Sequence, residues 1–152
     1  MSANQTTSTA VGNLLEVRDL KKYFPIHKGI LSRHVGDVKA VDGLNFDLAR
    51  QETLSLVGES GCGKTTAGRT LLRLYDPTAG SAIYRPEPDS DGIDLFQLSQ
   101  GEMRPYRRDL QIIFQDPYGS LNPRITVGNT IGEALTVHGV VTGSEMNDRV
   151  EQ

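Results

Sequence analysis

The sequence predicts an α/β fold in which antiparallel strands come before a strand–loop–helix unit. Residues 14–24 and 38–48 alternate apolar and polar side chains, which is typical of strands with one face in water. Residues 53–57 form a short apolar run before a glycine-rich turn, and the segment after the turn places apolar residues on one helical face. A β-rich apolar run at 110–114 predicts a second buried strand.

The two alternating segments are the first elements along the chain. Pro25 is expected to end the first strand, and residues 26–37 are expected to form a loop. In the second strand, Asp42-Gly43 predicts a turn or a bulge. The apolar strand at 53–57 follows after a turn.

Start and stop signals bound the later elements. The helix from Lys64 is expected to end near Asp76-Pro77, followed by a strand over 81–84 and a connector over 85–92. Ser99 and Glu102 have capping-box spacing, which predicts a short helix whose arginines form a solvated face. Thr126 predicts the cap of a helix that runs to His138 and stops at Gly139, and Ser144 is a candidate cap for another.

The turn GESGCGKT, residues 58–65, matches the phosphate-binding pattern G-x-x-x-x-G-K-[ST]. Glycines let the backbone wrap closely around an anion, its N–H groups point inward, and the following helix adds its positive end. Lys64 would supply a cation to the β- and γ-phosphates, and the Thr65 hydroxyl would bind Mg²⁺. The candidate nucleotide-binding residues are Gly58, Glu59, Ser60, Gly61, Cys62, Gly63, Lys64, Thr65 and Thr66.

Composition sets further bounds. The chain has 152 residues, enough for one domain, and 16 basic against 19 acidic residues, which gives no sign of nucleic-acid binding. The start is polar without a basic region, so we expect a disordered tail over 1–13 rather than a signal peptide. No apolar run approaches the roughly 18 residues of a membrane span. The only cysteine, Cys62, fits a reducing compartment and is interpreted as a small filler rather than a catalytic thiol.

Two phrases carry a family resemblance. GESGCGKTT and LSQGEMRPYRRDLQIIFQDPYGSLNPR resemble the ATP-binding subunits of ABC transporters, above all the oligopeptide/dipeptide import branch. The resemblance covers residues 14 to about 138. It implies a P-loop NTPase core with an N-terminal antiparallel β subdomain over 14–125 and the start of a helical subdomain over 126–152. It also implies ATP and Mg²⁺, permease subunits and a second ATP-binding subunit as partners, and a peripheral place on the cytoplasmic face of the membrane.

The resemblance assigns roles to single residues as well. Gln115 would reach the Mg²⁺ and the attacking water. The catalytic candidates are therefore Lys64 and Gln115. The candidates for binding the metal are Thr65 and Gln115. Phe24 would stack on adenine, with Tyr23 as the alternative, unless either ring packs in the core of its own strand. Gln51 stands where this branch usually has glycine, and a positive φ would strain it by roughly 1 kcal/mol.

Other motifs of the family are missing from the sequence: the LSGGQ signature, an apolar strand ending in Asp-Glu, and a switch histidine. The segment 98–102 mimics the signature but precedes Gln115. The expectation is a fragment of an ATPase that binds nucleotide weakly and turns over little. The alternatives are a non-catalytic binding module and a small P-loop kinase or GTPase using Asp116, which the absence of N-K-x-D disfavours.

Overall fold

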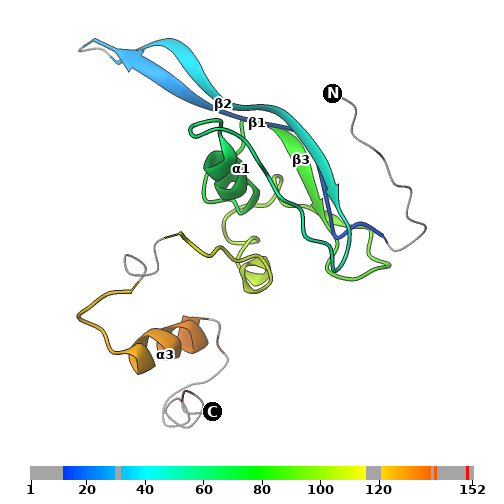
Figure 1. Ribbon diagram of the computed structural model, residues 1–152, viewed down its shortest axis with the longest axis vertical. Helices are drawn as coiled ribbons and strands as arrows, with labels where there is room; N and C mark the ends of the chain where they lie inside the picture. The colour runs from blue at the N-terminus through cyan, green and yellow to red at the C-terminus, as the bar shows by residue number, and fades with distance from the viewer. Residues whose placement is uncertain (1–11, 30–31, 116–120, 138, 140–149, 151–152) are drawn as a thin grey trace. The chain divides into compact units, whose positions relative to one another are not determined.

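The computed structural model describes residues 12–29, 32–115, 121–137, 139 and 150, and the chain divides into two units. The first unit ends at Arg104, and the second begins at Pro105. The first unit carries the sheet and the helix that positions the candidate site (Figure 1).

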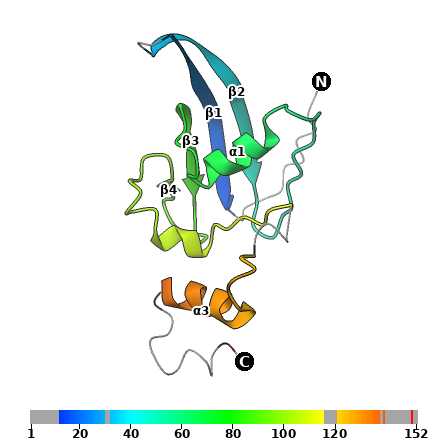
Figure 2. The same ribbon diagram turned by 90° about the vertical axis from the view of Figure 1, so that its left-hand side faces the viewer.

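The first unit is built on one antiparallel sheet. Its strands are β1 (Leu15–Lys28), β2 (Arg33–Leu48), β3 (Ala79–Tyr84) and β4 (Ile93–Asp94), in the order β2-β1-β3-β4. Helix α1 (Lys64–Leu71) contacts β1 and β2, and both views show it beside the sheet (Figures 1 and 2). The N-terminal antiparallel subdomain that the sequence predicts is therefore confirmed.

The first two strands form a longer hairpin than the sequence indicates. We expected Pro25 to end β1 and residues 26–37 to form a loop, and this expectation is wrong: Pro25 pairs with Asp37, and the ladder continues to Lys28↔Arg33. The β1–β3 ladder stops at Lys21↔Ala79. Pro25 thus lies where β1 has one neighbour, and a strand with an open side tolerates a residue without an N–H.

The predicted irregularity at Asp42-Gly43 is a bulge. The β1–β2 register passes from Leu20↔Leu44 to Lys21↔Asp42, which leaves Gly43 as the extra residue with a φ of 83°. The chain then turns at Gln51, which has the positive φ of 60° that we considered for it. The bulge bends β2 next to the loop that follows residue 57.

Helix α1 ends five residues earlier than predicted. Arg73 adopts a φ of 54° and closes a Schellman motif, with Leu74 N–H donating to Arg69 O (2.9 Å) and Arg73 N–H to Thr70 O (3.0 Å). Its guanidinium donates to the carbonyls of Leu95, Phe96 and Leu98. These tertiary bonds stabilise a left-handed residue that is not glycine, which local sequence signals do not reveal.

The core of the first unit lies between the sheet, α1 and the segment after β4. Its buried apolar residues come from all of these elements, and Thr70 of α1 is also fully buried. They are Val17, Leu20, Val41, Ala67, Ala82, Tyr84, Leu95, Phe96 and Met103. Burial on one face of each strand explains the alternation seen in the sequence.

Neither of the two predicted buried strands forms. Residues 53–57 are exposed coil, with Val57 90% exposed, and residues 111–114 are exposed coil as well, with Ile113 98% exposed. An apolar run becomes a buried strand only when neighbouring strands satisfy its backbone groups and cover its side chains. Among the described residues, no strand pairs with either segment.

The remaining predictions have mixed outcomes. The Ser99–Glu102 capping box is confirmed by reciprocal bonds, Ser99 N–H to Glu102 Oε2 (2.8 Å) and Glu102 N–H to Ser99 Oγ (3.3 Å), but turns follow instead of an α-helix. In the second unit, η1 (Pro105–Arg108) is a short 3₁₀ helix, and α3 (Val127–Val137) begins after the predicted cap, whose Thr126 Oγ1 accepts from Asn129 N–H (3.3 Å). Ser144 and His138 lie outside the described residues.

Candidate phosphate-binding site

The loop before α1 has the backbone that its glycines predict. Gly61 and Gly63 have φ values of 82° and 98°, and Gly63 is the N-cap of α1. The loop closes on itself through Cys62 N–H, which donates to Glu59 O (3.3 Å). Within the part of the chain that the structure describes, no acceptor takes the N–H groups of Gly61, Gly63 and Lys64, so they remain available to an anion at the helix start.

Gly63 also lies directly against β2. A Cβ at this position would lie 2.1 Å from Ala40 O and 3.6 Å from Val41 Cγ2. No side chain fits in that space. The last loop glycine is therefore required twice, by its positive φ and by the close approach of the loop to the strand.

Lys64 is folded back over the loop. Its Nζ donates to Gly58 O (2.7 Å) and Glu59 O (2.7 Å), and the Cys62 Sγ lies 3.6 Å away. The ammonium group therefore sits at the concave side of the loop, held by two carbonyls. A phosphate that enters the loop can replace those carbonyls as the partner of a cation that is already in position.

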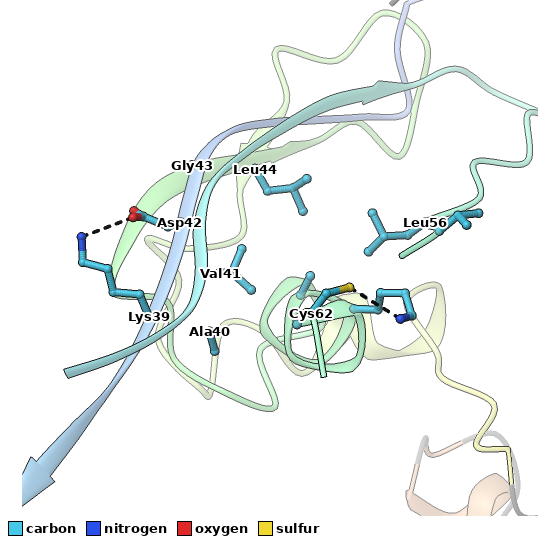
Figure 3. Close-up of a pocket in the computed structure, with 12 residues that line it drawn as sticks. Lys39, Ala40, Val41, Asp42, Gly43, Leu44, Leu56 and Cys62 are labelled. Carbon is cyan, nitrogen blue, oxygen red and sulfur yellow. Dashed lines mark hydrogen bonds and ion pairs between the residues drawn. The ribbon is translucent and has the colours of Figure 1, made fainter. Parts of the chain in front are cut away.

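A pocket of about 510 Å³ lies between β2 and this loop (Figure 3). In the close-up, the side chains of Val41 and Leu44 from β2 and of Leu56 and Cys62 from the loop side lie around the space. The sequence did not single out the β2 wall. This wall lies in the bulged part of β2, and Asp42-Gly43, which predicted the bulge, is the sequence signal that could have indicated it. The lining residues are Lys39, Ala40, Val41, Asp42, Gly43, Leu44, Leu56, Val57, Cys62, Gly63, Lys64 and Ala67.

The two aromatic candidates are half-buried and engaged elsewhere. Phe24 packs edge-on against Tyr75 with ring centroids 5.6 Å apart, and Lys22 Nζ lies 4.8 Å from its centroid. The Tyr23 hydroxyl donates to Asp42, and this hydrogen bond raises the pKa of Tyr23 and lowers the pKa of Asp42. Among the described residues, the pocket lining includes neither ring.

The other candidates are spread over both units. Thr65 is exposed and Thr66 half-buried in the first turn of α1, where the Thr66 carbonyl accepts from Thr70 Oγ1 (2.7 Å). Ser60 is exposed in the loop. Gln115 lies in exposed coil of the second unit, and its predicted reach toward Mg²⁺ stays a prediction. Asp116 lies outside the described residues.

Comparisons with known proteins bear on this site. The model of the ABC transporter family matches residues 41–152. The chain is 49% identical over 152 residues to the oligopeptide transport ATP-binding protein AppF of Bacillus subtilis, covering 99% of this chain and 43% of AppF. It is 47% identical over 137 residues to the glutathione import ATP-binding protein GsiA of Escherichia coli K12, covering 90% of this chain and 21% of GsiA.

Solved structures give the same fold. A dimeric ATP-binding cassette, MJ0796, in a post-hydrolysis state bound to ADP and Pi, superposes with a TM-score of 0.65 at 24% identity, over 90% of this chain and 54% of that chain. The chain thus spans about half of this structure and less than half of the curated relatives. The family match covers most of the sequence, and the chain belongs to the ABC transporter family.

Proposed function

We propose that this chain binds ATP with Mg²⁺ in the loop at 58–65 as the nucleotide-binding part of an ATP-binding subunit that energises uptake of peptides or similar solutes. One observation carries the proposal: Gly63, pressed against Ala40 O, holds the loop with free N–H groups and Lys64 at its concave side. The relatives are named for oligopeptide transport and glutathione import, which supports the class of solute.

The residue roles follow from their chemistry. The residues from Gly58 to Thr66 would form the cradle, in which the available N–H groups of Gly61, Gly63 and Lys64 would hold the phosphates. The Lys64 side chain would neutralise the phosphate charge. The Thr65 hydroxyl oxygen would hold Mg²⁺, which would supply further charge neutralisation at the phosphates. Phe24 would stack on adenine and Gln115 would complete the Mg²⁺ site, and both assignments rest on the family resemblance.

Partners and location are part of the same proposal. We propose permease subunits and a second ATP-binding subunit as partners, at the cytoplasmic face of the membrane, which agrees with the dimeric assembly of the structural neighbour. In the described part of the chain, no helix has the length and apolar character that a membrane crossing requires. We also propose that residues 14–125 belong to the ATPase core and 126–152 to the helical subdomain.

A second candidate is nucleotide binding without turnover. The apolar segments at 53–57 and 111–114 lie exposed, and among the described residues no strand pairs with either of them. Phosphoryl transfer to water depends on positioning and charge neutralisation by several groups at once. A chain with only the phosphate loop in place would bind MgATP and hydrolyse little of it.

Calorimetric titration of the purified chain with MgATP tests the proposal. Lys64→Ala is expected to weaken binding about tenfold or more, because a hydrogen bond to a charged group contributes roughly 1.5–3 kcal/mol. Lys28→Ala, a lysine of the β1–β2 hairpin outside the loop, is the matched control and should bind as the unchanged chain does. Equal affinities for the unchanged chain and Lys64→Ala would contradict the proposed site. A parallel phosphate-release assay separates the two candidates, since steady hydrolysis abolished by Lys64→Ala excludes binding without turnover.

A further inference from the structure

The β1–β2 hairpin carries a pair of histidines that the nucleotide site does not use. His27 and His34 are direct cross-strand partners in the part of the hairpin that extends beyond β3. Both side chains are exposed, and their ring centroids lie 5.9 Å apart with an interplanar angle of 69°. Figure 1 shows this end of the hairpin projecting away from β3 and α1.

The distance between the rings suits a shared cation. A metal–nitrogen bond of about 2 Å places the cation roughly 3 Å from each imidazole centroid, so two rings on one cation have centroids at most about 6 Å apart. The observed separation of 5.9 Å lies within this limit. Both side chains are exposed, so rotation about their χ angles can bring the rings closer and turn one nitrogen of each toward the same ion.

Asp37 supplies the support that a ligating histidine usually has. The Asp37 Oδ1 lies 3.0 Å from His34 Nε2. With Nε2 donating to this carboxylate, Nδ1 carries the lone pair and is the nitrogen free for a cation. A carboxylate on the second ring nitrogen fixes the tautomer and raises the basicity of the ligand.

The charges around the pair favour a cation on one face of the hairpin. Lys28 and Arg33 are the next cross-strand pair, and consecutive side chains of a strand point to opposite faces. Their positive charges therefore lie on the other face from His27 and His34. The register shift next to His27 leaves Val35 without a cross-strand partner, so Asp37, which pairs with Pro25, lies on the histidine face. The Asp37 carboxylate is the acidic group on the histidine face at this end.

We propose that His27 and His34 form a two-imidazole binding site for a divalent transition-metal cation of the Cu²⁺ or Ni²⁺ class, which imidazole nitrogens suit. No group of three or more His, Cys, Asp or Glu side chains in the described residues could hold a metal ion, so water completes the coordination. Asp37 acts as a positioning residue. The proposal is independent of the nucleotide site.

Calorimetric titration of the chain with Ni²⁺ at neutral pH is the test, together with the electron paramagnetic resonance spectrum of one equivalent of Cu²⁺. The variants are His27→Asn, His34→Asn, Asp37→Asn and, as the matched control, His138→Asn, which removes the third histidine of the sequence. All are made in a Cys62→Ser background, because a thiol competes for these ions.

The expected result is one Ni²⁺ site that either hairpin histidine substitution abolishes and His138→Asn leaves unchanged. Asp37→Asn should weaken the site about tenfold, as loss of a supporting carboxylate does. The Cu²⁺ spectrum should show coupling to two nitrogens, and to no more than one after His27→Asn. Unchanged Ni²⁺ affinity in His27→Asn or His34→Asn, or loss of binding in His138→Asn, would overturn the proposal.

Discussion

The close approach of Gly63 to β2 makes Gly63→Ala the sharpest test of the site geometry. A Cβ would lie 2.1 Å from Ala40 O, while ordinary contact begins at 3.4 Å, so the loop or the strand must move by about 1.3 Å. Overpacking of this kind costs about 1–3 kcal/mol. The φ of 98° adds about 1–2 kcal/mol for an L-residue with a side chain. The expected destabilisation is therefore about 2–5 kcal/mol.

Gly61→Ala is the matched control for this prediction. Gly61 also has a positive φ, 82°, but a Cβ there would meet nothing within 4 Å. Gly61→Ala should therefore lower the free energy of unfolding only by the cost of a side chain at positive φ, about 1–2 kcal/mol. The difference between the two variants isolates the contact with β2.

Urea denaturation followed by circular dichroism measures both variants. With a typical slope of about 2 kcal/mol per M, Gly63→Ala should lower the midpoint by about 1–2.5 M and Gly61→Ala by about 0.5–1 M. If Gly63→Ala fails to fold while Gly61→Ala folds, this result also supports the close contact between Gly63 and β2. Equal midpoints for the two variants would refute the close packing of the loop on β2.

Three further predictions concern contacts around the site. Tyr23→Phe removes the main cause of the lowered Asp42 pKa, so a carboxyl NMR titration should show this pKa rising toward 3.8. In the unchanged chain, the lowered pKa stabilises the folded state at pH values above the unfolded-state pKa of Asp42. This stabilisation is lost as the pH falls through the folded-state pKa. Ser99→Ala removes the acceptor of the Glu102 N–H and should raise the pKa of Glu102, which the Ser99 hydrogen bonds lower, in the same NMR titration. Arg73→Ala should cost about 3 kcal/mol, because the buried carbonyls of Leu95 and Phe96 and the partly buried carbonyl of Leu98 lose a charged donor.

Each of these has a clear negative result. An Asp42 pKa that does not move in Tyr23→Phe would mean that the hydroxyl is not its partner. A Glu102 pKa unchanged in Ser99→Ala would exclude the reciprocal cap. An Arg73→Ala variant as stable as Arg73→Lys, each measured in urea, would contradict the dependence on a forked guanidinium donor.

Local signals in the sequence predicted the features that depend on neighbouring residues. The glycine pattern gave the positive φ of Gly61 and Gly63, and the Ser99–Glu102 spacing gave a capping box that forms in both directions. The alternation around Gly43 gave two strands and a bulge. These features depend only on residues that are close in sequence, or on a second strand that a short turn connects to the first. A few consecutive residues therefore suffice to predict them.

Tertiary contacts explain most of what the sequence did not reveal. The left-handed Arg73 ends α1 early because its guanidinium finds acceptors more than twenty residues away, which no helix-stop rule includes. Pro25 stays in β1 because that part of the strand has an open side. The pocket wall of β2 likewise depends on the close approach of Gly63 to Ala40, two residues far apart in the sequence.

Tertiary contacts also explain why the two apolar segments do not form the predicted strands. An antiparallel hairpin such as β1–β2 provides its own partner through a short turn, whereas a buried strand between other strands needs neighbours that the chain must bring from elsewhere. Residues 53–57 and 111–114 have the apolar character of such strands but lie exposed as coil. The loop at 58–65 nevertheless has the positive φ values of Gly61 and Gly63, and Gly63 lies against β2, while Ala67 of α1 is buried in the core. The anion-binding geometry thus depends on the antiparallel subdomain, and for this reason Gly63, rather than the preceding segment, is the position where substitution is expected to disrupt it.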